Sequence, residues 1–158
     1  MILRPEYRYL RDREAYEVFH LIDMLRDFSM YDYNHVLTRM WHVAEVEEYT
    51  PYIQTEKLER IYGWDTQMNS NGILIDGTLF METVGTLHEI ESGIFMRVID
   101  ANSPIQLPST PRFWKGPDTF QSPNIDIEIR ISETFFYEII TEDTSIIDCL
   151  TYRYKMWE

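Results

Sequence analysis

The apolar positions near the start of the chain recur at helical spacing. They predict an amphipathic helix over about residues 13–28, with Asp12 as its N-cap. A second, shorter helix is predicted over 56–62, between Thr55 as cap and Gly63 as terminator. The buried face of the first helix is expected to contain Ala15, Val18, Phe19, Ile22, Leu25 and Phe28.

The pattern of the next segment, residues 36–49, fits both a helix and a strand. Apolar residues recur every three positions, which suits a helix, but the β-branched and aromatic content suits a strand. Of these two possibilities, we predict a strand. The recurring positions are Leu37, Met40, Val43 and Val46.

The middle of the chain has apolar segments separated by turn residues, a pattern typical of antiparallel hairpins. Apolar segments at 73–75 and 78–84 flank Asp76-Gly77, a dipeptide that favours a two-residue turn because both positions tolerate positive φ. A further strand is predicted at 94–100.

Residues 125–131 alternate between isoleucine and polar residues. The pattern predicts a half-exposed antiparallel strand, with Asp126, Glu128 and Arg130 on a solvated outer face. Residues 135–141 are its expected hairpin partner. A final helix should follow a cap at Asp143 or Thr144, and the residues expected to face inward are Ile146, Ile147 and Leu150.

These elements define an α+β fold. We expect an antiparallel sheet of about five to six strands in meander-like order, with two or three helices packed on one face. The length of 158 residues indicates a single globular domain, residues 1–158. A chain of this size buries roughly 70% of its extended surface, so it needs no disulfide or metal to hold its core.

The charge of the chain limits its partners. There are 27 acidic and 14 basic residues, which give a formal net charge of −13. This balance disfavours direct binding of nucleic acid or an anionic membrane, both of which need surplus Lys and Arg. It also exceeds the magnitude of roughly 2–8 that suffices for solubility, so a basic partner is the simplest reason for it.

The chemistry-bearing residues are few. No phosphate-binding, zinc-protease or nucleophile-elbow motif is present, and Cys149, the only cysteine, is predicted to be inert beside Glu142 and Asp148. His42 with Glu45, and His88 with Glu89 and Glu91, have spacings that metal ligands use. A structural or solvated role is more common for such pairs, and we predict no metal and no cofactor.

Residues 103–124 contain five of the seven prolines and the aromatic run around Trp114. This segment either covers part of the core or presents aromatic anchors to a partner, and we favour the covering role. The first 62 residues contain eight tyrosines, many beside carboxylates, a composition typical of interfaces.

The main functional hypothesis is a stoichiometric inhibitor that binds a basic, nucleic-acid-handling protein, as an immunity protein or a phage-type anti-defence protein does. Such a protein would act in the cytoplasm, including that of a host cell, as a monomer or homodimer. The residues predicted to contact the partner are Glu45, Glu47, Glu48, Asp126, Glu128, Glu133, Glu138, Glu142, Asp143 and Trp114.

Two alternative functions are also compatible with the sequence. One is a small metal-assisted hydrolase that uses His42, His88 and nearby carboxylates. The other is an assembly subunit in which the strand at 125–131 pairs with a second copy.

Overall fold

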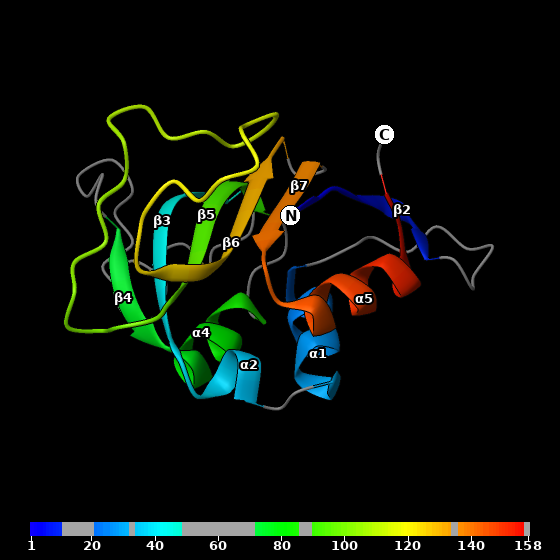
Figure 1. Cartoon of the computed structure of the whole chain (residues 1–158), viewed down its shortest axis with the longest axis horizontal. Helices are drawn as coiled ribbons and strands as arrows, with labels where there is room; N and C mark the ends of the chain where they lie inside the picture. Colours follow the sequence, from blue (N-terminus) through cyan, green and yellow to red (C-terminus); the bar gives the residue numbers. More distant parts are fainter. Residues whose placement is uncertain (11–20, 32–33, 49–71, 86–89, 134–135, 157–158) are drawn as a thin grey trace.

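The computed structural model describes residues 1–10, 21–31, 34–48, 72–85, 90–133 and 136–156. Within these ranges the strands form one antiparallel sheet, and the helices lie together on one of its faces (Figure 1). This arrangement confirms the predicted α+β class.

The described strands follow the order β4-β3-β5-β6-β7-β2-β8 across the sheet, with β1 also paired to β7. Consecutive strands β5, β6 and β7 are neighbours, which is the meander-like part. The strands are β1 (Ile2–Leu3), β2 (Pro5–Leu10), β3 (Met40–Glu48), β4 (Ile73–Asp76), β5 (Ile90–Val98), β6 (Ile125–Ser132), β7 (Phe136–Thr141) and β8 (Tyr154–Met156).

Most predicted strands and helices are present where they can be compared. The strand predicted within 36–49 is β3, the alternating segment is β6, and its hairpin partner is β7. The first helix is described only from Leu21 onward, and the helix predicted at 56–62 lies outside the described residues. The described helices are α1 (Leu21–Tyr31), α2 (Asn34–Leu37), α4 (Gly77–Val84) and α5 (Thr144–Arg153).

The hairpin predicted at Asp76-Gly77 is wrong, because residues 77–84 form helix α4. Asp76 is its N-cap: the carboxylate accepts a hydrogen bond from the backbone N–H of Leu79 at 2.9 Å. Gly77 is required by close packing, since a Cβ there would lie 1.9 Å from the carbonyl oxygen of Val36. Phe80, Thr83 and Val84 then form the buried face at helical spacing.

The C-terminal helix is confirmed. Asp143 is the N-cap of α5, and its carboxylate accepts a hydrogen bond from the backbone N–H of Ser145 at 2.9 Å. Ile146 and Leu150 are buried against the sheet, and Ile147 is partly buried at the margin of the same cluster.

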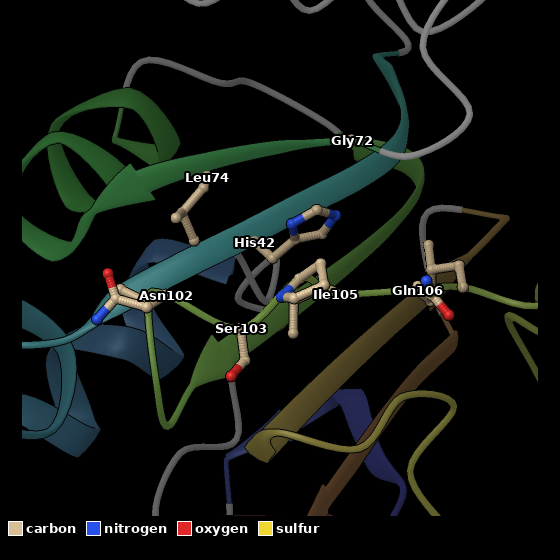
Figure 2. Close-up of a pocket in the computed structure, with 10 residues that line it drawn as sticks. His42, Gly72, Leu74, Asn102, Ser103, Ile105 and Gln106 are labelled. Atoms are coloured by element: carbon tan, nitrogen blue, oxygen red, sulfur yellow. The ribbon is translucent and has the colours of Figure 1, made fainter.

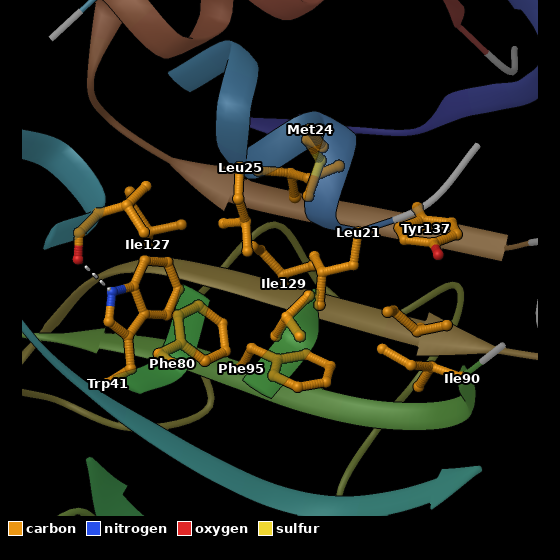
Figure 3. Packing of buried hydrophobic residues seen from close by; sticks show 14 of the residues in the cluster. Leu21, Met24, Leu25, Trp41, Phe80, Ile90, Phe95, Ile127, Ile129 and Tyr137 are labelled. Atoms are coloured by element: carbon orange, nitrogen blue, oxygen red, sulfur yellow. Dashed lines mark hydrogen bonds between the residues drawn. The ribbon is translucent and has the colours of Figure 1, made fainter. Parts of the chain in front are cut away.

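The main core lies between the sheet and the helices (Figure 3). Trp41 of β3 stacks on Phe80 of α4 with ring centroids 4.4 Å apart, and its indole N–H donates to the carbonyl of Val36 at 3.1 Å. Helix α1 adds Leu21, Met24 and Leu25, and β6 adds Ile127 and Ile129. Ile127, Ile129 and Ile131 therefore face this core, as the alternation predicts. The same prediction is wrong for Ile125, which packs with Ile94 and Met96 in a second cluster, because the pairing of β5 with β6 shifts register between Arg97 and Val98.

The opposite face of the sheet is not the solvated surface that the alternation predicted. Residues 99–124, here called the cover segment, run across it on the side away from the helices (Figure 1). Beneath this segment the side chains of Glu128 and Arg130 have no exposed surface. The prediction failed because alternation shows only that two faces differ, and a covered polar face has the same pattern as a wet one.

Candidate functional site

A buried ionic network occupies the covered face of β6 and β7. Arg130 lies between two glutamates: its Nε is 2.7 Å from Glu128 Oε1, and its Nη1 is 3.2 Å from Glu138 Oε2. Arg4 adds a second cation, with Nε 2.8 Å from Glu138 Oε1. Two carboxylates and two guanidinium groups therefore balance one another, and of the four only Arg4, 27% exposed, reaches solvent.

The cover segment supplies the remaining hydrogen bonds of this network. Gln121 donates its backbone N–H to Glu128 Oε2 at 2.8 Å and its side-chain amide to Oε1 at 2.7 Å. The backbone N–H of Lys115 donates to Glu138 Oε1 at 2.7 Å, and Arg130 Nη2 donates to the carbonyl of Thr119 at 3.0 Å. The network thus ties residues 115–121 to the sheet at three positions.

The fit between cover and network is close. Gly116 lies directly over Arg130, where a Cβ would come within 2.3 Å of Nη1. A side chain at position 116 would displace the guanidinium group from its carboxylate partners. Residue 116 is therefore part of the same arrangement, although nothing in its sequence context indicates this.

Apolar contacts hold the rest of the cover segment. Its residues Ile105, Leu107, Phe113 and Phe120 pack on the covered side of β5 and the start of β6, at Ile94, Met96 and Ile125. Trp114 lies 4.8 Å from the ring of Phe136 between centroids, and the Arg4 guanidinium lies 5.7 Å from the Trp114 ring. The covering role favoured for this segment is confirmed.

Two of the predicted partner contacts are wrong for this reason. Glu128 and Glu138 are wholly buried and fully engaged in the network, so they cannot touch a partner in this structure. Trp114 is half-buried and contributes to the cover, with only part of its ring reaching solvent.

Two further predicted contacts have structural roles. Asp126 forms a bidentate pair with the buried Arg97, with both N–O distances 2.8 Å. Asp143 caps α5.

Of the other predicted contacts, Glu133 and Glu142 are exposed and lie at opposite ends of β7. Glu45 is half-buried with φ of 53° at an irregular position of β3. Glu47 and Glu48 belong to β3, and the surroundings of their side chains lie outside the described residues. The predicted set is therefore not one continuous patch.

A pocket of about 700 Å³ opens at the β3–β4 corner of the covered face (Figure 2). His42 of β3 and Leu74 of β4 are cross-strand neighbours that line it, and residues 101–107 of the cover segment form the opposite wall. His42 is 8% exposed. Neither lysine nor arginine is among the described lining residues.

This corner does not form a metal site within the described residues. No group of three or more His, Cys, Asp or Glu side chains comes together in the ranges that the structure describes. His88 and Glu89, the other half of the hydrolase hypothesis, lie outside those ranges.

A polar cluster on the helix side joins α1, α5 and β8. The Tyr154 hydroxyl donates to Asp27 Oδ2, and Arg153 Nε lies 3.2 Å from the same oxygen. Burial, followed by the charge of Asp27, raises the pKa of the Cys149 thiol to about 11. The inert state predicted for this cysteine agrees with that shift, but its cause is burial and Asp27 rather than Asp148 and Glu142.

Comparisons with known proteins give no relative: no family model, no curated protein and no solved structure matches the chain. None of the described helices is both long and apolar enough to cross a membrane.

Proposed function

We propose that this protein is a stoichiometric binding protein for a basic, nucleic-acid-handling protein, which it inhibits in the manner of an immunity or anti-defence protein. The main support for the proposal is that ion pairs neutralise several arginines and carboxylates and leave the other charged residues predominantly acidic. Four arginines and four carboxylates neutralise one another at or beneath the surface: Arg4, Arg97, Arg130 and Arg153 with Asp27, Asp126, Glu128 and Glu138.

This pairing makes the remainder of the chain more one-sided. Of 27 acidic and 14 basic residues, 23 acidic and 10 basic ones are left after these four of each are set aside. The ratio of acid to base rises from about two to one to more than two to one, while the net charge stays at −13. Charge of one sign at the surface accelerates encounter with an oppositely charged protein.

The size of the excess also argues for a role beyond solubility. Self-repulsion among like charges lowers the stability of the folded state. An excess of this size is therefore expected where the electrostatic field serves a function, such as attraction of a partner. A basic nuclease or a similar protein presents the complementary field, because it must itself attract phosphate.

The test is to capture the partner and then measure the complex with purified components. Immobilised protein is exposed to lysate at low salt, bound basic proteins are identified, and each is purified. We expect a 1:1 complex by calorimetry, loss of the partner's nucleic-acid activity in the complex, and an association rate that falls at least about tenfold between about 20 and 300 mM salt.

A pair of charge variants gives a matched control. Glu142→Gln removes an exposed negative charge and Lys115→Gln removes an exposed positive one. The first should slow association and the second should accelerate it, each by about twofold at low salt. An association rate indifferent to salt, or no stoichiometric complex with any basic protein, would contradict the proposal.

A further inference from the structure

Among the described strands, the short strand β4 is the last on one side of the sheet. It consists of four residues, Ile73–Asp76, and among the described strands it pairs only with β3. The far side of such a strand carries main-chain N–H and C=O groups that another extended chain can bind.

Side chains beside this edge favour a second chain. Leu74 is 42% exposed, one of the few large apolar residues of the described ranges that is exposed to this extent, whereas its neighbour Ile75 is in the core. Leu74 points to the same side as His42, at the mouth of the pocket (Figure 2). An added strand would therefore have both a backbone edge and a recess for a side chain.

The charges near this corner, together with the net charge of the protein, favour a basic second chain. Asp76 and Asp100 are exposed near the pocket, and the backbone N–H of Asn102 and the hydroxyl of Ser103 lower the pKa of Asp100, which keeps it ionised. The exposed Arg39 lies just before β3, so the corner is only moderately acidic. The net charge of −13 opposes pairing with a second copy of the same chain and favours a basic one.

We propose that β4 and the pocket at His42 bind an extended basic segment of the partner. The segment adds to the sheet as a strand next to β4, and one apolar side chain enters the pocket beside Leu74. The backbone pairing provides affinity and the pocket provides selectivity. The basic character of the segment rests on the proposed function, whereas the strand edge and the pocket do not.

The proposal is tested with a short peptide of alternating Lys and Val. Its binding is measured by fluorescence anisotropy, and the site is mapped from amide chemical shifts of isotope-labelled protein. We expect the largest shifts at residues 73–76 and at His42. A Lys-Pro peptide of equal charge, which lacks half of the backbone N–H groups, should bind at least about tenfold more weakly. An alternating Glu-Val peptide should not bind.

Two protein variants distinguish an effect of the position of an added lysine from an effect of its charge. Leu74→Lys places a cation at the proposed edge, and Tyr152→Lys makes the same kind of change at a residue of α5 that is 67% exposed. We expect Leu74→Lys to weaken the Lys-Val peptide at least about tenfold and Tyr152→Lys less than twofold. Leu74→Ser, which adds no charge, serves if Leu74→Lys lowers the melting temperature.

Each outcome decides something. Equal binding of the Lys-Val and Lys-Pro peptides, equal losses in the two lysine variants, shifts away from β4, or no peptide binding would overturn the proposal. If the captured basic partner binds Leu74→Lys as tightly as wild type, this inference fails and the proposed function stands. If no basic partner exists but the peptide maps to β4, the proposed function fails and the edge site stands.

Discussion

The two faces of the sheet differ in how they are covered. On one face, β6 presents isoleucines to helices α1, α4 and α5, and the contacts are apolar. On the other face, the same strand presents Glu128 and Arg130 to the cover segment, and the contacts are charged hydrogen bonds. Both faces are buried. The contacts that β6 makes on the first are apolar, and the polar pairs of Asp27 with Tyr154 and Arg153 on that side join α1, α5 and β8 instead.

This difference has an energetic consequence. Apolar packing degrades gradually when a group is removed, because the loss scales with the buried area and the cavity that remains. A buried ionic network degrades abruptly, because removal of one partner leaves the others charged, dehydrated and unpaired. The covered face should therefore be the more sensitive of the two to a single substitution.

The largest effect is expected for Arg130→Ala. It would leave Glu128 and Glu138 buried without their central cation, and we expect a loss of about 3–5 kcal/mol in the free energy of unfolding. Urea denaturation followed by circular dichroism measures it.

Arg97→Ala is the matched control for this prediction. Arg97 is also buried, but its partner Asp126 keeps about a third of its side chain exposed. That carboxylate can be hydrated when the cation is removed, so the loss should be clearly smaller. Equal losses in the two variants would show that burial of the arginine, rather than of its partners, decides the cost.

The next largest effect is expected for Gln121→Ala. It removes the side-chain hydrogen bond to the buried Glu128 and two exposed ones to the main chain of Arg112, while the backbone bond of residue 121 to Glu128 remains. Loss of a hydrogen bond to a buried carboxylate should cost about 2 kcal/mol by urea denaturation. A change below about 0.5 kcal/mol would mean that the cover contributes little to holding the network.

Part of this network could be predicted from the sequence. The hairpin formed by β6 and β7 places Arg130 opposite Glu138, and alternation places Glu128 on the same face, so three of its members follow from local pattern. The sequence favoured a covering role for this segment, but it could not show that Gln121 and Lys115 bind the network, because they reach it through folding of an irregular segment back onto the sheet. The feature of the sequence that indicates such a covered face is a strand with one polar face that follows a long proline-rich segment.

Helix α4 was mispredicted for a different reason. Asp-Gly serves both as a hairpin turn and as an N-cap followed by a tight first residue, and the apolar residues of 78–84 fit either period over so short a length. The helix is selected by tertiary packing of Phe80 against Trp41. The pocket at His42 likewise depends on the position of residues 101–107, which no local pattern contains.

An intermediate effect is expected from alkaline pH, and it tests the helix side of the sheet. The pKa of Cys149 is raised from 9.0 to about 11, so the thiol keeps its proton in the folded state where the unfolded chain loses it. Its contribution is complete below about pH 9 and is lost as the pH rises toward 11, on the order of 1 kcal/mol at pH 10. The raised pKa of Tyr154 acts in the same direction.

Urea denaturation at pH 8 and pH 10 measures this slope, and Cys149→Ala separates the thiol from the tyrosines. The variant should lose less stability than wild type over this interval. Identical slopes in the two proteins would mean that Cys149 is not protected from ionisation by burial.

The smallest effect is expected for Arg26→Gln. Its pair with Asp23 is 3.8 Å long and both side chains are largely exposed, so the change in unfolding free energy should be below about 0.5 kcal/mol. A loss comparable to that of Arg130→Ala would remove the distinction between exposed and buried ion pairs on which the comparison of the faces depends.

The most direct test of the buried network is amide hydrogen exchange at Lys115 and Gln121. Their backbone N–H groups donate to Glu138 and Glu128, although both residues lie in a segment without regular secondary structure. The account predicts that they exchange as slowly as the amides of β6, with protection that follows global unfolding. Exchange at the rate of an exposed loop, while β6 remains protected, would contradict it.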